Sequence, residues 1–214
     1  MSMSASQEHN GVVYIIDDDR SVRQGLDDLF ASIGMTAVSF SSVREFLDHP
    51  RSPGPACLIL DVRMPVQTGT EFFAQMAGLG IEMPVIFITG HGDIAMGVKA
   101  MRDGAVDFLS KPFREHDLLD AVHGALDAEK KRLQNESIRL EISKRWQNLT
   151  PGERDVFGLV VQGLLNKQIA GQLGIKEITV KVRRAHVMQK MQAGSLAELV
   201  RLSIVIGEAD CNPG

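Results

Sequence analysis

The chain has 214 residues and a net charge of −4, which fits a globular protein of two ordinary domains, each able to bury its own core. Residues 1–122 carry 17 acidic against 9 basic side chains, a net of −8, whereas residues 123–214 carry 10 against 14, a net of +4. Nucleic acid is therefore a candidate partner for the second half, although two domains can also differ in charge by chance.

Neither secretion nor membrane insertion is indicated by the sequence. Residues 1–10 are polar and lack the apolar core of a signal peptide, and no run is long enough to span a bilayer. Cys57 lies in an apolar run and Cys211 in the terminal tail, so we expect no disulfide framework and two free thiols in a reducing compartment. We expect a cytoplasmic protein with no membrane partner.

Short apolar runs alternate with segments of helical spacing through the first half. The runs predict five strands, at Val12–Ile16, Thr36–Phe40, Cys57–Asp61, Pro84–Thr89 and Val106–Leu109. The segments between them predict helices that start after Ser21, after Ser41 or Ser42, at Thr70, at Ile94 and at Asp117. This alternation predicts an α/β domain with a parallel sheet covered on both faces.

Polar side chains follow these strands, and the carboxyl ends of parallel strands meet at one edge of a sheet. They are Asp17, Asp18 and Asp19 after the first strand, Asp61 at the end of the third, Thr89 at the end of the fourth and Lys111 after the fifth. Clustered carboxylates repel one another unless a cation neutralises them, and Mg²⁺ is held by one or two carboxylates with water and phosphate oxygens. The alternative is a solvated acidic rim beside a surface lysine.

The same set of residues suggests phosphoryl transfer to Asp61. A metal ion would screen this carboxylate enough for its oxygen to attack a phosphorus atom, and it would take up charge from the transferring group. Thr89 and Lys111 would then hold the phosphoryl oxygens.

Four motifs over residues 11 to about 125 resemble those of response-regulator receiver domains. They are Ile-Ile-Asp-Asp at 15–18, Leu-Asp-Val-Arg-Met-Pro at 60–65, Ile-Thr-Gly at 88–90 and Ser-Lys-Pro-Phe at 110–113. The resemblance implies a flavodoxin-like sheet of strand order 2-1-3-4-5. It also implies phosphorylation of Asp61 by a sensor histidine kinase, and a cis Lys111–Pro112 bond.

The resemblance further implies a site for Mg²⁺ or Mn²⁺ on Asp18, Asp61 and the main-chain carbonyl of Arg63, with Asp17 acting largely through water. A run of three acids can match the family's acid pair in two ways. We place the pair at Asp17 and Asp18 because they directly follow the strand. The family's aromatic switch corresponds to Phe108, which fits a plain core residue equally well.

Residues 123–147 contain no proline and, after Gly124, no glycine, which predicts a long helix extending the last helix of the first domain. Leucines recur every seven residues, as in a coiled coil, at Leu119, Leu126, Leu133 and Leu140. The second seam position is mostly polar, so we expect no full zipper and at most a weak contact with a partner chain. The expected organisation is a domain over 11–126, a helical linker over 127–147 and a second domain over 148–208.

Four helices are predicted in the last part of the chain. Thr150 and Glu153 form a capping box with Pro151 at the first helical position, and Asn166 is expected to cap the next helix. The expected helices cover 151–163, 167–173, 178–191 and 196–206. Two helices joined by a turn, the second of them rich in Lys and Arg, are typical of a helix-turn-helix.

The third of these helices is the one expected to enter a DNA major groove. Val180, Val187 and Met191 recur at helical spacing and are expected to face the core. Side chains able to contact phosphates and base edges lie elsewhere on this helix or on the preceding one: Lys167, Thr179, Lys181, Val182, Arg183, Arg184 and Lys190. The alternative is a small helical bundle with a basic, solvated face.

The motifs Leu-Thr-x-x-Glu-Arg-x-Val at 149–156 and Gly-Leu-x-Asn-Lys-x-Ile-Ala at 163–170 resemble the LuxR-type helix-turn-helix. The whole chain thus resembles FixJ/NarL-type transcriptional response regulators. Two departures stand out, because the family commonly has His in place of Arg183 and Ser in place of Lys176. Loss of a Ser cap costs on the order of 1 kcal/mol. Both changes add positive charge, which we expect to raise nonspecific phosphate affinity more than sequence discrimination.

The combined interpretation is a transcription regulator activated by phosphorylation. The phosphorylated form is expected to bind double-stranded DNA as a homodimer, with RNA polymerase as a further candidate partner. We expect no enzyme activity beyond slow autodephosphorylation of Asp61. A phosphatase is disfavoured, because Arg63 occupies the place where haloacid-dehalogenase-type phosphatases need a second Asp. A constitutive DNA binder whose receiver serves only for dimerisation is the remaining alternative.

Overall fold

The computed structural model describes residues 11–90 and 94–210. Contacts divide the chain between Leu133 and Gln134 into two compact units, here named the N-terminal unit and the C-terminal unit. The division lies inside one long helix, α5 (Glu115–Gln147), so the continuous helix predicted for residues 123–147 is present. Across the described ranges, no helix combines the length and the apolar character needed to cross a membrane.

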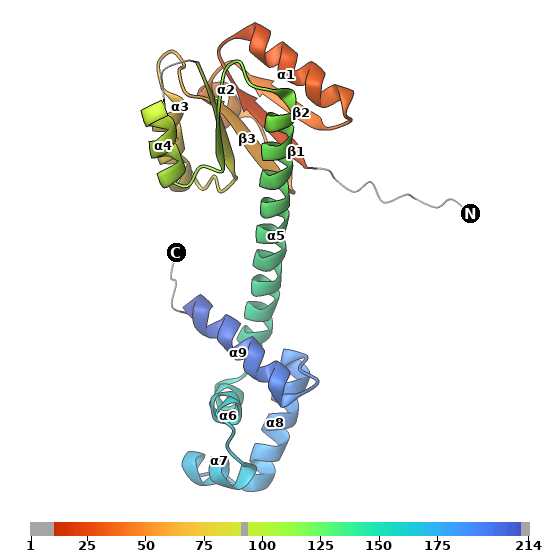
Figure 1. Ribbon diagram of the computed structural model, residues 1–214. Helices are drawn as coiled ribbons and strands as arrows, with labels where there is room; N and C mark the ends of the chain where they lie inside the picture. Colours follow the sequence, from red (N-terminus) through yellow and green to blue (C-terminus); the bar gives the residue numbers. More distant parts are fainter. Residues whose placement is uncertain (1–10, 91–93, 211–214) are drawn as a thin grey trace, which may run out of the picture. The chain divides into compact units, whose positions relative to one another are not determined.

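The N-terminal unit is built on a five-stranded parallel sheet in the order β2-β1-β3-β4-β5 (Figure 1). The strands are β1 (Val12–Ile16), β2 (Thr36–Phe40), β3 (Ala56–Asp61), β4 (Val85–Thr89) and β5 (Asp107–Ser110). The predicted strands are all present, and the sheet order implied by the resemblance is confirmed.

Helices cover both faces of this sheet. Besides α5 they are α1 (Arg20–Ser32), α2 (Val43–Asp48), α3 (Gly69–Met76), the 3₁₀ helix η1 (Ala77–Leu79) and α4 (Ile94–Arg102). In β1, Tyr14 and Ile16 face a core shared with α2, α3 and α4, whereas Val13 and Ile15 face a core shared with α1 and α5. Because both faces are buried, the strands are nearly uninterrupted apolar runs in the sequence.

The start of α1 differs from the prediction. The helix begins at Arg20, and its N-cap is Asp19, whose Oδ1 accepts hydrogen bonds from the N–H of Ser21 at 2.8 Å and from its hydroxyl at 2.6 Å. Ser21, the predicted cap, lies inside the helix, because the backbone is extended at Asp19 and becomes helical from Arg20 onward. The two hydrogen bonds from Ser21 lower the pKa of Asp19.

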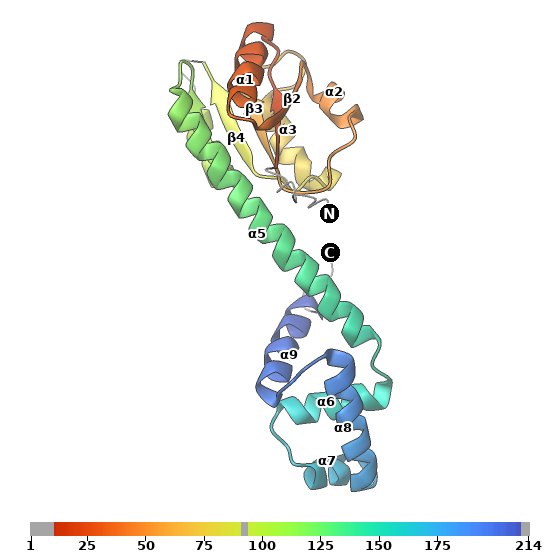
Figure 2. The same ribbon diagram turned by 90° about the vertical axis from the view of Figure 1, so that its right-hand side faces the viewer.

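The C-terminal unit holds α6 (Pro151–Val161), α7 (Asn166–Leu173), α8 (Glu177–Met191) and α9 (Leu196–Asp210), the four predicted helices (Figure 2). Val180, Val187 and Met191 of α8 are fully buried in its core, as expected. Ile142, in the last turns of α5, is buried in the same core.

The two helices of the helix-turn-helix, α7 and α8, begin without a capping hydroxyl or carboxylate. Asn166, the predicted cap of α7, is its first helical residue, because the side chain of Gln168 bonds back to the N–H of Leu165 at 2.8 Å and replaces the cap. At the start of α8, Lys176 stands in the cap position and makes no capping hydrogen bond. The start of α8 therefore relies on packing rather than on a cap.

Candidate functional site

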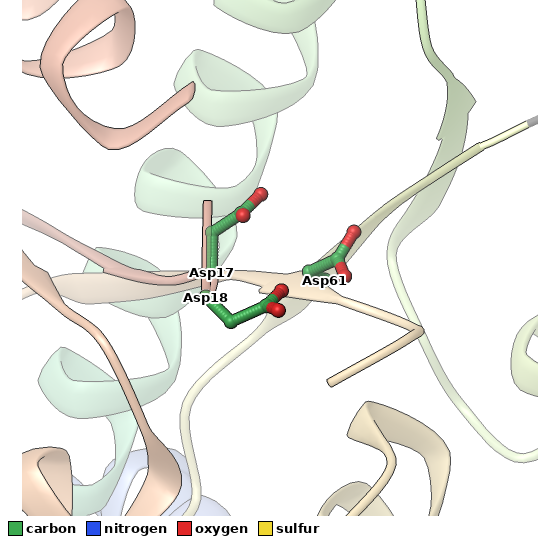
Figure 3. A group of neighbouring side chains, drawn as sticks. All are labelled: Asp17, Asp18 and Asp61. Atoms are coloured by element: carbon green, nitrogen blue, oxygen red, sulfur yellow. The ribbon is translucent and has the colours of Figure 1, made fainter. Parts of the chain in front are cut away.

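The carboxylates of Asp17, Asp18 and Asp61 form a cluster in which one oxygen of each lies within 4.8 Å of the others. Figure 3 shows them side by side at the ends of β1 and β3, which are neighbours in the sheet. Asp17 and Asp61 are buried, and Asp18 is exposed. All the donors are hard oxygens and one of them is open to solvent, so the cluster suits a hard divalent cation.

Lys111 reaches this cluster from the end of β5, an edge strand of the sheet. Its Nζ lies 2.6 Å from Asp17 Oδ2 and 2.9 Å from Asp61 Oδ1, although the residue follows β5. The Lys111–Pro112 peptide bond is cis, as the resemblance implied. One ammonium group thus bridges the two buried acids that sequence reasoning placed at this edge.

Burial and charge act on these groups in opposite directions. Burial raises the pKa of Asp61, and the charge of Asp17 adds to this, while the hydrogen bond from Lys111 works against both. Burial opposes the charged form of Lys111, yet its bonds to the two carboxylates raise its pKa overall. The ammonium therefore stays charged and compensates the two acids when no metal ion is bound.

The second oxygen of each buried acid is also occupied. Asp17 Oδ1 accepts the N–H of Asp19 at 2.8 Å, and Asp61 Oδ2 accepts the N–H of Arg63 at 3.1 Å. Arg23, which sequence reasoning missed, donates from Nη1 to the main-chain oxygen of Asp17 at 2.6 Å. Asp17 and Asp18 thus belong to the carboxylate cluster, whereas Asp19 caps helix α1.

Thr89 lies on β4, the strand next to that of Asp61, and Phe108 lies on β5, one strand further along the sheet. Thr89 is buried at the end of β4, and its main-chain oxygen accepts the N–H of Lys111 at 2.6 Å. Phe108 of β5 is half-buried and fills the space that Gly97 leaves on α4, where an added Cβ would lie 2.7 Å from the ring. Thr89 is thus bonded to the residue that bridges the carboxylates, and Phe108 packs against α4.

Gly69 is another residue of this site that the sequence did not reveal. Any side chain there would clash with the main-chain oxygen of Asp61, and the Gly69 N–H bonds to the oxygen of Val62 at 3.0 Å. The start of α3 is thereby pressed against the end of β3, which fixes the backbone that carries Asp61. Only the short segment between Pro65 and Gly69 could have suggested such a close approach of α3 to β3.

On the surface of the C-terminal unit, the predicted DNA-contacting residues fall into two groups. Lys167, Lys181 and Val182 are exposed, and Thr179 is half-buried. Ile178, which sequence reasoning did not single out, is 64% exposed beside them. These side chains come from α8 and the start of α7, which pack against each other.

The second group is half-buried and bonded within the unit. Arg183 Nη1 lies 3.5 Å from the main-chain oxygen of Gly152, and Arg184 Nη1 lies 3.2 Å from Asn166 Oδ1. Lys190 Nζ lies 2.6 Å from an oxygen of Glu153. Helical periodicity predicts the face of the helix on which a residue lies, but it does not predict these hydrogen-bond partners.

Glu153 is a buried acid of the C-terminal unit. Its Oε2 accepts hydrogen bonds from Lys190 Nζ and from the Thr150 N–H at 2.8 Å, and its Oε1 lies 3.3 Å from His186 Nδ1. Burial opposes the charged form, but the bonds from Lys190 and Thr150 prevail and lower the pKa of Glu153 to about 2. The predicted capping box of α6 is thus also an ionic link between α6 and α8.

Two family models match the chain. The response regulator receiver domain matches residues 13–123, and the luxR family of bacterial regulatory proteins matches residues 147–203. The chain is 47% identical over 196 residues to nodulation protein W of Bradyrhizobium diazoefficiens, which covers 92% of this chain and 86% of that protein. It is 42% identical over 197 residues to the transcriptional regulatory protein FixJ of Azorhizobium caulinodans, covering 92% of this chain and 93% of FixJ.

Among solved structures, the response regulator StyR matches with a TM-score of 0.83 and 44% identity, covering 90% of this chain and 98% of StyR. The chain therefore belongs to the response regulators that join a receiver domain to a LuxR-type DNA-binding domain. It is a phosphorylation-dependent transcriptional regulator, a class whose members are generally not enzymes. The receiver domain implies a histidine kinase and a divalent metal ion as partners, and the LuxR-type domain implies DNA.

Proposed function

We propose that Asp61 accepts a phosphoryl group from a sensor histidine kinase, and that this switches dimerisation and DNA binding by the C-terminal unit. The observation that carries the proposal is the position of Asp61. It is a buried carboxylate at the end of β3, grouped with Asp17 and Asp18, with Lys111 Nζ 2.9 Å from its Oδ1. A carboxylate so placed has the cation partners that phosphoryl transfer requires.

Mg²⁺, or Mn²⁺ in its place, is the metal ion proposed for this site. Asp18, Asp61 and the main-chain carbonyl of Arg63 would bind it directly, and Asp17 through water. The cluster of three carboxylates supports this assignment, because hard divalent cations prefer such oxygens. When bound, the ion takes up negative charge on the transferring phosphoryl group.

Thr89 and Lys111 are proposed to bind the phosphoryl oxygens after transfer. Lys111 already faces Asp61, and Thr89 ends the strand next to it. A shift of Thr89 towards the phosphoryl group would change the space beside Phe108, the proposed switch residue, whose ring packs on Gly97 of α4. Phosphorylation would then bias the surface of α4 and β5 between two arrangements.

The output is proposed to be a homodimer that binds two DNA half-sites in the cytoplasm and can contact RNA polymerase. In this proposal the receiver covers residues 11–126, the linker 127–147 and the DNA-binding domain 148–208. The DNA contacts are proposed for Lys167, Thr179, Lys181, Val182, Arg183, Arg184 and Lys190. Slow autodephosphorylation of Asp61 would end the signal.

Intact-mass spectrometry tests the phosphorylation site directly. Wild type and Asp61→Ala are incubated with Mg²⁺ and acetyl phosphate, and the same samples are passed over a sizing column. One added phosphoryl group that is absent from the variant, with a shift to dimer, is the expected result. Phosphorylation of Asp61→Ala to the same extent would contradict the assignment of the site. A dimer that forms equally without phosphorylation would favour the constitutive DNA binder.

A further inference from the structure

Three basic side chains of α8 lie on the flank that faces α6. Arg183, His186 and Lys190 are spaced by three and four residues, which places them on one side of the helix. His186 and Lys190 both approach the carboxylate of Glu153, with distances of 3.3 Å and 2.6 Å. Arg183, nearer the start of α8, meets α6 at Gly152 instead.

The guanidinium of Arg183 occupies the space that a side chain at position 152 would fill. A Cβ built on Gly152 would lie 2.6 Å from Cζ and Nη1 of Arg183 and 3.0 Å from Nη2. Any side chain at 152 must therefore displace the guanidinium. Since this group is the free end of a flexible side chain, the displacement moves its charge without unfolding the unit.

The charge of Arg183 is only weakly compensated at this place. Its contact with α6 is one long hydrogen bond, 3.5 Å, to an uncharged main-chain oxygen. The carboxylate of the next residue, Glu153, is already bonded to Lys190, His186 and the N–H of Thr150. A guanidinium has five donors in a planar fork, so Arg183 keeps donors for a phosphate group.

The position of Arg183 on α8 also suits a DNA backbone. Val182, the preceding residue, is exposed about 100° round the same helix turn. When such a helix lies in a major groove, its outermost side chains face base edges and its flanks face the phosphates beside the groove. Arg183 is on a flank.

We propose that Gly152 is a positioning residue for DNA binding, because it seats the Arg183 guanidinium where it contacts a backbone phosphate of duplex DNA. This inference rests on the DNA-binding surface proposed above and adds that the position of the Arg183 guanidinium depends on Gly152. A phosphate contact strengthens binding to any sequence and adds to its salt dependence.

A double-mutant cycle tests the pair. The full chain, treated with Mg²⁺ and acetyl phosphate, is compared as wild type, Gly152→Ala, Arg183→His and the double variant. The probes are a duplex selected by the wild type from a random-sequence library and an unrelated duplex, each measured over a salt series at about pH 8, where exposed histidine is neutral. Each single change is expected to lower the salt slope by about one and to weaken both duplexes by the same factor. The double variant is expected to bind no more weakly than Arg183→His alone.

Two further variants control for the added methyl group and for the lost charge. Gly158→Ala changes another glycine of α6, around which there is open space, and should leave both affinities and the slope unchanged. Adding Arg183→Lys to Gly152→Ala should restore the slope, because a lysine stem is thin enough to pass the methyl group. Circular dichroism checks that each variant is folded.

Three outcomes would overturn the inference. Additive losses in the double variant would mean that the two residues act separately. An unchanged salt slope in Gly152→Ala would mean that the space at Gly152 does not determine where the Arg183 guanidinium lies. If the wild-type chain selected no duplex from the library and did not bind the unrelated duplex, the DNA-binding function itself would be overturned, and the inference with it.

Discussion

At the edge of the receiver sheet, Asp17 and Asp61 are buried and share the ammonium group of Lys111, whereas on α8 the side chains of Lys181 and Val182 lie in solvent. The first arrangement is assembled before any ligand arrives, as phosphoryl transfer demands. The second leaves charge and apolar surface free for a long, flexible polyanion. Changes at the receiver site should therefore disturb stability and function together, while changes to the exposed side chains Lys181 and Val182 should alter DNA binding alone.

The largest effect on stability is expected for Lys111→Gln. Removal of the ammonium leaves two nearly buried carboxylates without their shared cation, which should lower the free energy of unfolding by roughly 3 kcal/mol in metal-free buffer. Saturating Mg²⁺ should restore part of this loss, because the ion binds only the folded cluster. Urea unfolding followed by circular dichroism, with and without Mg²⁺, measures both effects. An unchanged stability in metal-free buffer would show that the bridge is not energetically coupled to the fold.

Next in size is Glu153→Gln, which removes the carboxylate charge from the ionic cluster of the C-terminal unit. Loss of its charged hydrogen bonds to Lys190 and Thr150 should lower the free energy of unfolding by roughly 1.5–3 kcal/mol. Trp146 is the single tryptophan and packs on Phe157 of this unit, so its fluorescence follows the unit selectively.

The stabilisation by Glu153 should also depend on pH. Its pKa of about 2 in the folded chain lies below the ordinary value of 4.5, so the folded state favours the carboxylate. The stabilisation is therefore present above pH 4.5 and is lost as the pH falls from there towards 2. Unfolding of the wild type should weaken over this window, and Glu153→Gln should show a smaller change; equal slopes would contradict the account.

A smaller effect of opposite sign is expected for Lys176→Ser at the uncapped start of α8. A serine can accept a hydrogen bond from the first turn, which should raise the stability of the C-terminal unit by about 0.5–1 kcal/mol. In the receiver, Ser42→Ala removes an existing cap, since Ser42 Oγ accepts the N–H of Glu45 at 3.3 Å, and should cost about as much. Thermal unfolding of both variants measures the gain in stability from Lys176→Ser and the loss from Ser42→Ala. No gain from Lys176→Ser would mean that packing alone fixes this helix start.

The smallest change in stability is expected for Lys181→Gln, within about 0.5 kcal/mol of the wild type, because the side chain is exposed. DNA binding should nevertheless weaken, with a salt slope lower by about one if Lys181 contacts a phosphate. Gel-shift titrations over a salt series, beside urea unfolding of the same protein, separate the two effects. A loss of stability as large as that of Lys111→Gln would remove the contrast between the two regions.

Much of the fold could be predicted because its signals are local. Short apolar runs marked the five strands, and the acids and the lysine that follow them marked the edge at which Asp17, Asp61 and Lys111 meet. The capping box at Thr150 likewise depends on residues three positions apart, and it is present in the structure.

Contacts between distant segments could not be predicted in this way. Gly69 against Asp61 and Gly152 against Arg183 are close approaches that depend on how elements pack, and a single glycine in a sequence gives no sign of them. The cap of α1 was misplaced for a related reason, since Asp19 and Ser21 are both good caps and only the backbone geometry decides between them.

The most direct test of the account is the affinity of the full chain for the selected duplex before and after treatment with Mg²⁺ and acetyl phosphate. Wild type and Asp61→Asn are measured side by side. We expect treatment to tighten binding by the wild type, roughly 5- to 150-fold if the coupling is of ordinary size, and to leave Asp61→Asn unchanged and weak. If untreated Asp61→Asn bound the duplex as tightly as the treated wild type, phosphorylation of Asp61 would not be the switch.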